Sequence, residues 1–478
     1  MPKYIFLILL LAIFSCKKED SLLNENQKLS FSNDTIIFDT IFSSIGSITK
    51  TLTVYNNNAN DIITDIEING VDAAHFRMNI DGVPGNKQSD IHIPANDSIF
   101  IFLEITIDPS NLNTPFILTD SIIFRKNNHE QNVKLVAWGQ NAYFHTANTF
   151  GEIINNEDTT RFYYHLINEN TIWENNKPHV IYGYVIIEGG YELLIEAGSN
   201  IHLHKNSGII VGNPFSNTTG ASLQINGNLN NEVIIQGDRL DPWYRDLPGQ
   251  WDRIWLMPGS INNKINYAII KNGSVAIHAD SVYNNNPTVE ISNCIIKNIS
   301  NIGILGQGAH IKAENTIISN CGQYAIACNI GGEYEFNHCT IGNYWSFNNR
   351  KNPSILLNNY YEGADGNIYI RNLNKAEFTN CIIDGSLSSE ISFDKHESGV
   401  FNYHFNHTLV KIDPNINTNN QNYTNVIKNQ NPLFKSLNDF HLEIESPAIN
   451  AGINSNTTND IEGNIRLNPD LGAYEYQD

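Results

Sequence analysis

Apolar and polar residues alternate in short runs through the first third of the chain. Thr51–Tyr55 and Ile99–Ile107 follow this pattern, and clusters of turn-forming residues such as Asn56–Asn60 separate the runs. An alternating run places every second side chain on the same face of a strand, so that one face is buried and the other is exposed. The pattern predicts an antiparallel β-sandwich over residues 30–141.

From residue 145 to residue 445 the pattern changes to a repeat. A turn residue, a small residue and then aliphatic residues recur in the runs Asn293–Asn298, Asn315–Asn320, His338–Asn343 and Asn380–Gly385. The first three runs begin 22 and 23 residues apart, and the interval of 42 before the fourth fits one coil with two insertions. The repeat predicts a parallel β-helix whose coils stack about 4.8 Å apart.

The repeat predicts two inward-facing columns, since residues two positions apart share a face of a strand. The small column would contain Ala268, Cys294, Thr316, Cys339, Cys381 and Thr408. The aliphatic column would contain Ile270, Ile296, Ile318, Ile341, Ile383 and Val410. We expect a ladder of corner asparagines with left-handed backbone two residues further on, at Asn272, Asn298, Asn320 and Asn343.

Five cysteines fall within the predicted β-helix. Cys294 and Cys339 would lie two coils apart, roughly 9–10 Å, which is too far for a disulfide. Cys321 and Cys328 fall in one coil, and the sequence leaves open whether they are two buried thiols or a disulfide.

Several of these segments resemble known families. Leu193–Asn200, Pro248–Trp251 and Ile265–Gly273 resemble right-handed parallel β-helix proteins of pectate-lyase-like fold, within a branch of Bacteroidetes lipoproteins. Ser446–Gly452, Asp460, Gly463, Arg466 and Asp470–Tyr476 resemble the closing segment of choice-of-anchor Q β-helix proteins. The resemblance implies that residues 446–478 cap the open end of the helix, where strand edges would otherwise be exposed.

The N-terminal segment resembles immunoglobulin-like domains of the abnormal-spindle and Hydin type. The residues that carry this resemblance are Phe38–Ile41, Thr51–Asn56, Ile105–Pro109 and Leu135–Gly139. Such domains space or present other modules. The predicted fold class is therefore all-β, an immunoglobulin-like β-sandwich followed by a right-handed parallel β-helix.

The first twenty residues indicate where the protein is located in the cell. Tyr4–Phe14 is apolar but too short to span a bilayer, and Ile13–Cys16 resembles a bacterial lipobox. We expect residues 1–15 to be a signal peptide, Cys16 to carry lipid and residues 16–29 to form a tether. Lys17–Asp20 resembles an export signal for surface lipoproteins, which implies an outer-membrane protein that is anchored by lipid and exposed on the cell surface.

Composition narrows the choice of partner. The chain of 478 residues has 29 Lys and Arg against 50 Asp and Glu, a formal net charge of −21, which argues against a nucleic-acid partner. It also argues against an anionic polysaccharide held by Lys and Arg alone, although bound cations such as Ca²⁺ could reverse this locally. Asn makes up about 15% of the residues and favours turns over helices.

The segment Gly237–Trp255 is the first candidate site. It contains the aromatic residues Trp243, Tyr244, Trp251 and Trp255 and the charged residues Arg245, Asp246, Asp252 and Arg253. Aromatic faces beside polar groups suit a sugar ring, which has C–H faces and orientable hydroxyls. Asp246 and Asp252, with Arg245 or Arg253, are the candidate catalytic residues, and a loop that only stabilises its own fold is the alternative.

The two insertions are the second candidate. Tyr344–Lys351 contributes Trp345, Phe347 and Arg350, and Asn359–Asp365 contributes Tyr360 and Tyr361, which are candidates for ligand binding or for plain solvated loops. His202 and His204 share a strand face but lack a third ligand, so no metal site is predicted.

Three functions remain open at this point. The polygalacturonase signatures are absent from the sequence, which favours a non-catalytic glycan-binding or adhesive module. A polysaccharide lyase or glycoside hydrolase, and a protein-interaction scaffold, are the alternatives. Burial of Trp243, Trp251 and Trp255 would remove the main support for both glycan hypotheses.

Overall fold

The computed structural model describes residues 21–22, 27–43, 46–108, 116–126, 129–155, 158–282 and 286–477. The predicted signal peptide and Cys16 lie outside these ranges. The chain divides into two compact units between Ala142 and Tyr143, and each unit is described by itself. Within the described ranges no helix is long and apolar enough to cross a membrane.

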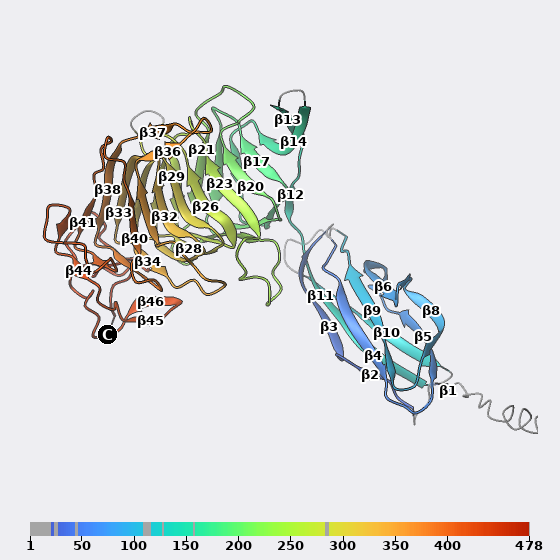
Figure 1. Cartoon of the computed structure of the whole chain (residues 1–478). Helices are drawn as coiled ribbons and strands as arrows, with labels where there is room; N and C mark the ends of the chain where they lie inside the picture. Colours follow the sequence, from blue (N-terminus) through green and yellow to red (C-terminus); the bar gives the residue numbers. More distant parts are fainter. Residues whose placement is uncertain are drawn as a thin grey trace, which may run out of the picture. The chain divides into compact units, whose positions relative to one another are not determined.

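The first unit is a β-sandwich, as predicted (Figure 1). One sheet has the order β1-β5-β10-β11-β3, with β8 also paired to β5; its strands are β1 (Ser21–Leu22), β3 (Thr35–Phe42), β5 (Ile62–Ile68), β8 (Lys87–Ile93), β10 (Phe116–Lys126) and β11 (His129–Gln140). The second sheet has the order β2-β4-β9-β6-β7; its strands are β2 (Ser30–Phe31), β4 (Lys50–Asn56), β6 (Phe76–Ile80), β7 (Val83–Pro84) and β9 (Asp97–Ile105). A short 3₁₀ helix, Ala73–His75, precedes β6.

Alternation along the strands builds the sandwich core. In β9, Ile99, Ile101, Leu103 and Ile105 are buried while Phe100 and Phe102 are exposed on the other face. At the start of the described chain, Ser21 and Leu22 of the predicted tether pair with Ile62 and Ile63 of β5.

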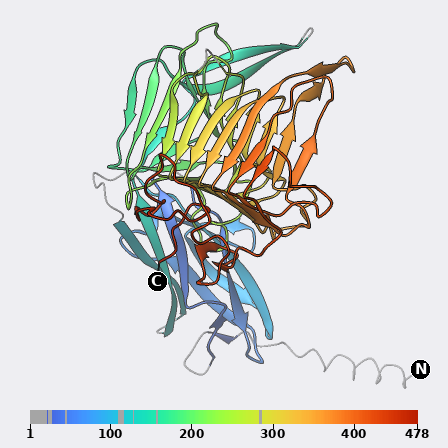
Figure 2. The same cartoon turned by 90° about the vertical axis from the view of Figure 1, so that its left-hand side faces the viewer.

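The second unit is a parallel β-helix built from three sheets, which we call sheets I, II and III (Figures 1 and 2). Within the described residues, sheet I has eleven strands: β12 (Tyr143–His145), β16 (His179–Ile181), β19 (Asn200–Leu203), β22 (Val233–Gly237), β25 (Ala268–Lys271), β28 (Ile295–Ile299), β31 (Ile317–Cys321), β34 (Thr340–Asn343), β39 (Ile382–Gly385), β42 (Leu409–Val410) and β44 (Ile427–Lys428).

The chain passes from sheet I to sheet II and then to sheet III in each full coil. As far as the chain is described, sheet II has ten strands: β13 (Thr149–Asn155), β14 (Asp158–Ile167), β17 (Tyr184–Ile187), β20 (Gly208–Val211), β23 (Trp251–Leu256), β26 (Gly273–Ala279), β29 (Ile302–Gln307), β32 (Tyr324–Asn329), β35 (Ile355–Asn358) and β40 (Ile391–Asp394). Sheet III also has ten over the same ranges: β15 (Thr171–Trp173), β18 (Glu192–Glu196), β21 (Ser222–Asn226), β24 (Asn263–Asn266), β27 (Val289–Ser292), β30 (His310–Glu314), β33 (Gly332–Asn337), β38 (Leu373–Thr379), β41 (His404–Asn406) and β43 (Tyr423–Thr424). Two hairpins lie outside the sheets, β36–β37 (Tyr360–Glu362, Ile368–Ile370) and β45–β46 (Phe434–Ser436, Asp439–Leu442).

The register confirms the predicted columns. Ile270 pairs with Ile296, Ile296 with Ile318, and Ile318 with Ile341, and the aliphatic and small columns are both buried. Thr340 pairs with Ile382, so the interval of 42 residues is one coil that carries two insertions. Burial of such continuous apolar columns is the main stabilising term of a stacked solenoid.

The corner ladder differs from the prediction. Asn272, Asn298 and Asn320 have the expected left-handed backbone, but Asn343 does not, and its side-chain oxygen instead accepts a hydrogen bond from the Cys321 amide at 2.9 Å. A second column occupies the turn from sheet III to sheet I, where left-handed Asn293, Asn315, His338, Asn380 and His407 stack. Here Asn315 Nδ2 donates to Asn293 Oδ1 at 3.1 Å, and Asn380 Nδ2 lies 2.9 Å from His338 Nε2.

The five cysteines of the β-helix are free, buried thiols. Burial raises the pKa of Cys294 and of Cys321 to about 12. Cys321 and Cys328 are therefore two buried thiols and do not form a disulfide. The cysteines act as small apolar fillers of the core.

The C-terminal segment 446–477, which we call the strap, does not lie where we expected. It runs along the flank of the β-helix: Asn380 Nδ2 donates to the Ile453 carbonyl, Asn315 Nδ2 donates to the Asn459 carbonyl, and Gly463 lies beside Leu229. The physical reason is the outer face of sheet I, where Ile317, Ile382 and Leu409 point outward and need cover. Apolar strap residues supply it, namely Ala448, Ile461, Leu471 and Ala473.

A buried ionic cluster holds the strap together. The Arg466 guanidinium pairs with the Glu475 carboxylate and also donates to Asn315 Oδ1 of the β-helix at 3.0 Å. Asp460 accepts from the backbone amides of Glu462 and Asn464, and Asp470 accepts from those of Asn450 and Tyr476. The motif residues that resemble the choice-of-anchor Q segment are therefore structural in this chain.

Candidate functional site

Most of the long connections of the β-helix border sheet II, the exception being residues 411–422, which join sheet I to sheet III. Residues 238–250 and 344–354 lead into it from sheet I, and residues 212–221, 280–288 and 359–372 lead out of it to sheet III. The turns from sheet III back to sheet I have six residues or fewer. Because binding residues concentrate on loops that a rigid scaffold positions, the outer face of sheet II is the candidate site.

A hydrogen-bonded network crosses this face, with side chains from β17, β23, β26 and β29. Asp252 Oδ2 accepts from the Tyr184 hydroxyl at 2.9 Å, and the Arg253 Nε–H donates to the same carboxylate at 3.1 Å. Burial, together with the Asp252 charge, raises the pKa of Tyr184, which keeps its hydroxyl protonated and donating. The network thus begins with a carboxylate that is already paired.

His278 continues the network toward the next coil. Arg253 Nη1 lies 3.2 Å from His278 Nδ1, and since a guanidinium can only donate, Nδ1 must accept and carry no proton. Nε2 then carries the proton and lies 2.7 Å from Gln307 Oε1 and 3.3 Å from Asp280 Oδ1. The imidazole thus connects Arg253 on β23 to Gln307 on β29.

Trp255 completes this cluster. Its Nε1 donates to Asp280 Oδ2 at 2.8 Å, and its ring stacks on His278 at 5.3 Å with an angle of 2° between the planes. The covered ring face is unavailable to a sugar. Trp255 therefore has one ring face covered and its indole nitrogen fixed by Asp280.

A second polar cluster lies at the other end of the same sheet. Asp394 accepts from the Tyr360 hydroxyl at 2.8 Å and from Asn358 Nδ2 at 2.9 Å. Hydrogen bonding to Asp394 raises the pKa of Tyr360. Tyr361 stacks on Tyr369 within the β36–β37 hairpin at 5.1 Å.

The 238–250 loop places its predicted residues in different surroundings. Trp243 is 77% exposed, whereas the Tyr244 ring is covered by the Arg239 guanidinium at 3.5 Å. Asp246 pairs with Arg245 at 3.6 Å and with Lys271 at 3.1 Å. The two candidate catalytic carboxylates, Asp246 and Asp252, are therefore each paired with cations.

Trp251 is wrong as a ligand-binding prediction. It is 1% exposed, belongs to the core of the β-helix, and donates from Nε1 to the Lys271 carbonyl at 2.8 Å. A tryptophan at the first position of a strand that is buried on its inner face packs inward because that removes most apolar area from water.

The 344–354 insertion is also more structural than predicted. The buried Arg350 guanidinium forms a bidentate pair with Glu390, at 2.6 and 2.8 Å, so Arg350 cannot reach a ligand and this prediction is wrong. Trp345 is buried and donates to Asn348 Oδ1 at 2.9 Å, which also removes it as a stacking residue. Phe347 remains exposed beside it, at 4.9 Å between ring centroids.

Metal binding gains no support from the geometry. His202 is buried, which lowers its pKa to about 4, and His204 Nδ1 pairs with Asp238 at 2.7 Å, so the two imidazoles have different partners. In the described part of the chain, no group of three or more His, Cys, Asp and Glu residues could hold a metal ion. The cluster of Asp252 and Asp280 is among the groups that do not form such a site.

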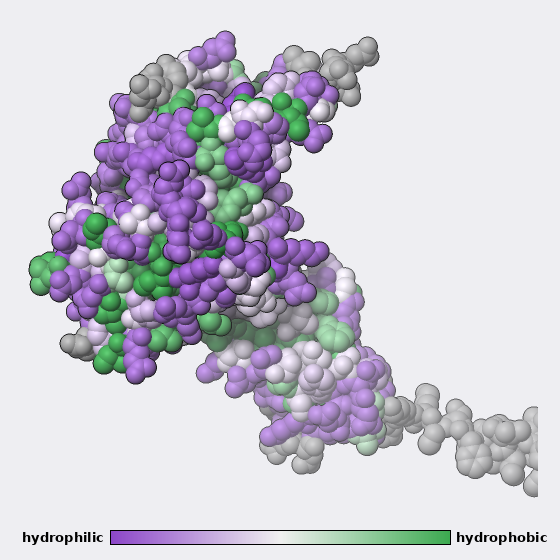
Figure 3. Space-filling view, turned by 60° about the vertical axis from the view of Figure 1, so that its left-hand side comes forward, coloured by the Kyte–Doolittle hydropathy of each residue, from purple (hydrophilic) through white to green (hydrophobic). Residues whose placement is uncertain are grey.

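Sequence reasoning missed His278, Asp280, Gln307 and Asp394. The runs Ile302–Gly306 and Tyr324–Cys328 share the 22-residue period, and the structure pairs Trp255 with His278 and His278 with Leu305 in the same sheet. Extending that alignment to the outward positions would have found the network. Figure 3 shows that hydrophilic residues predominate on the visible surface, and hydrophobic ones gather in separate patches.

Comparison with known proteins gives only distant likenesses. No protein-family profile and no curated protein matches the chain. A family 87 α-1,3-glucanase catalytic unit from Streptomyces thermodiastaticus shares 10% identity at a TM-score of 0.28, covering 75% of this chain and 79% of the other. The PapD-like domain 7 of human CEP192 shares 8% identity at a TM-score of 0.18. This match covers 26% of this chain and 92% of that domain's chain.

A family 123 glycoside hydrolase from Clostridium perfringens shares 8% identity at a TM-score of 0.19, covering 24% of this chain. The match spans 30% of that hydrolase. At scores this low, none of the likenesses bears on activity or ligand, so the functional argument depends on the site itself.

Proposed function

We propose that the protein binds a glycan on the outer face of sheet II without cleaving it. The observation that carries the proposal is the pairing of the acidic groups. Asp246 pairs with Lys271, Asp252 with Arg253 and Tyr184, and Asp280 with Trp255. A general acid or base needs a carboxyl group that is ready to exchange its proton with the substrate, whereas a binding face needs fixed donors and acceptors.

The chemistry of the face favours a neutral polysaccharide. The two clusters contain three carboxylates, those of Asp252, Asp280 and Asp394, and one guanidinium, that of Arg253. The whole chain has a net charge of −21. An anionic polymer would be repelled. Hydroxyl groups can donate to these carboxylates and to amide oxygens, and Trp243 and Phe347 supply exposed aromatic faces on the bordering loops.

Coil spacing supports the same proposal. Successive strands of sheet II lie about 4.8 Å apart, which is close to the length of one sugar unit in an extended chain. A polysaccharide that lies across the strands would meet the partly exposed side chains of Trp255 and Leu305, two coils apart, whereas His278 and Ala327 in the same column are buried.

The test is affinity gel electrophoresis of the full chain with soluble neutral and anionic polysaccharides, with and without calcium, together with assays for new reducing ends and unsaturated products. We expect retardation by a neutral polysaccharide and no product. New chain ends would show an enzyme and direct attention to Asp252 and Asp280. Absence of both signals would favour the protein-interaction scaffold.

We also propose that the protein is a surface lipoprotein of the Bacteroidetes type, with Cys16 lipidated and the sandwich as a spacer. The Ile13–Cys16 lipobox and the acidic run after Lys18 support this. Metabolic labelling with a radioactive fatty acid in a bacterial host should label the wild type and not the Cys16→Ser variant. Equal labelling of both would refute lipidation at this position.

A further inference from the structure

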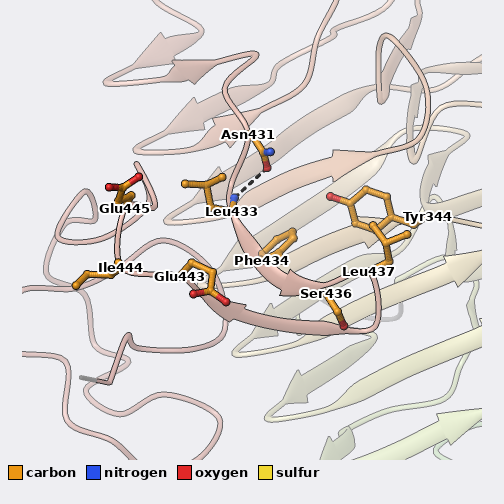
Figure 4. A pocket seen from close by; sticks show the side chains of 9 residues that line it. All are labelled: Tyr344, Asn431, Leu433, Phe434, Ser436, Leu437, Glu443, Ile444 and Glu445. Atoms are coloured by element: carbon orange, nitrogen blue, oxygen red, sulfur yellow. Dashed lines mark hydrogen bonds between the residues drawn. The ribbon is translucent and has the colours of Figure 1, made fainter.

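A pocket lies on the C-terminal hairpin, away from the outer face of sheet II. Its volume is about 640 Å³, and Figure 4 shows its lining residues on β45, on the loops before and after β45 and after β46, and at Tyr344 just after β34. The floor is apolar, with Leu433, Phe434 and the ring of Tyr344. The lining also includes Asn431, Ser436, Leu437, Glu443, Ile444 and Glu445.

The shape of the pocket depends on an unusual backbone at Leu433. Its φ is 52°, in the left-handed region that a branched side chain rarely adopts. Asn431 Oδ1 accepts from the Leu433 amide at 3.0 Å, and the Leu433 carbonyl accepts from the Glu443 amide at 2.8 Å. These bonds hold a conformation that costs energy, and such positions cluster at binding sites.

The rim combines exposed apolar side chains with unpaired charge. Leu437 is 61% exposed and Ile444 is 71% exposed, so two large apolar side chains face solvent at the edge of the pocket. Glu443 and Glu445 flank Ile444, and among the described residues neither carboxylate has a hydrogen bond or ion pair. The cation nearest in sequence, Lys435, is not part of the lining.

We propose that this pocket receives a short segment of a partner protein that carries a lysine or arginine beside an apolar side chain. The apolar side chain would fill the floor against Phe434 and Leu433. The cation would lie between Glu443 and Glu445 at the rim, where charge-assisted hydrogen bonds are stronger than neutral ones. The surplus of acidic residues in the whole chain would steer such a segment toward it.

Fluorescence polarisation with the full chain tests the proposal. The probe is a fluorescein-labelled hexapeptide of alternating lysine and leucine, compared with one of alternating lysine and serine. We expect the lysine–leucine peptide to bind at least about tenfold more tightly, a difference of about 1.4 kcal/mol. Equal binding of the two peptides would show attraction by charge alone and would overturn the proposal, as would absence of binding.

Two variants locate the site. The pair Glu443→Gln and Glu445→Gln should weaken binding about tenfold, and Leu437→Ser should weaken it several-fold, with circular dichroism spectra unchanged because all three residues are exposed. The matched control is Glu169→Gln with Glu192→Gln, which changes the net charge equally in the turn before β15 and on β18, far from the pocket along the sequence. Equal weakening by the control pair would refute the assignment to this pocket.

Discussion

Several histidines of this β-helix are buried, and their pKa values differ strongly from those in water. Burial lowers the pKa of His145 and of His338 to about 3, and that of His179 to about 4. In an unfolded chain the same groups titrate near 6.5. Each of them therefore binds its proton more weakly in the folded state than in the unfolded state.

This difference predicts a loss of stability in acid. Below about pH 6.5 these histidines bind protons in the unfolded state but not in the folded state. The free energy of unfolding therefore falls as the pH is lowered toward 4. Each such histidine contributes a slope of up to about 1.4 kcal/mol per pH unit. Urea unfolding at pH 7, 6, 5 and 4, followed by circular dichroism, measures the slope.

His338→Asn tests one of these groups. Asn380 holds the equivalent left-handed corner position one coil later, so asparagine fits the backbone there. The charged group beside His338 is Arg466, which opposes its protonation further. We expect the variant to fold and to lose part of the pH slope, and an unchanged slope would contradict the assignment.

At the scale of elements, the 344–354 insertion depends on one buried ion pair. Glu390 lies in the next coil, and besides Arg350 it accepts from the Ser354 hydroxyl and amide. Arg350→Met would leave a buried carboxylate without its cation, which costs about 3–5 kcal/mol. Urea unfolding should show this loss.

Arg245→Met is the matched control for that prediction. Arg245 is more than half exposed and lies 3.6 Å from Asp246, so its removal should change the free energy of unfolding by less than about 1 kcal/mol. Equal effects of the two substitutions would mean that the Arg350–Glu390 pair does not anchor the insertion.

Most of the fold could be predicted from the sequence because the residues that repeat are those whose side chains face the core. The columns through Ile296 and Cys294 required only a fixed period. The candidate site was harder, because its residues lie on outward positions where no packing constrains the type. Arg350 and Trp251 were misassigned since a sequence shows that a side chain is large and polar or aromatic, but not which partner covers it.

At the scale of the molecule, the strap ties the coils together along one flank. The resemblance indicated that this segment closes the helix, but not which surface it covers, because that depends on the outward apolar residues of sheet I. Chain termination after residue 445 would expose Ile317, Ile382 and Leu409 to water. We expect a lower midpoint of thermal unfolding, measured by circular dichroism.

Point variants keep that prediction testable if the shortened chain does not fold. Arg466→Ala leaves Glu475 buried without its cation and should lower the midpoint by several degrees. Leu467→Ser, a neighbour that is 81% exposed, should leave the midpoint unchanged. Equal midpoints for the wild type, Arg466→Ala and Leu467→Ser would show that the strap does not stabilise the β-helix.

The central claim is that the outer face of sheet II binds a glycan, and one substitution tests it most directly. Leu305 lies at the middle of that face, between His278 and Ala327. Leu305→Arg should obstruct the face, whereas Leu194→Arg makes the same change on the outer face of sheet III. Affinity electrophoresis in the polysaccharide that retards the wild type should show retardation abolished by Leu305→Arg and kept by Leu194→Arg. Retardation that survives Leu305→Arg would contradict the account.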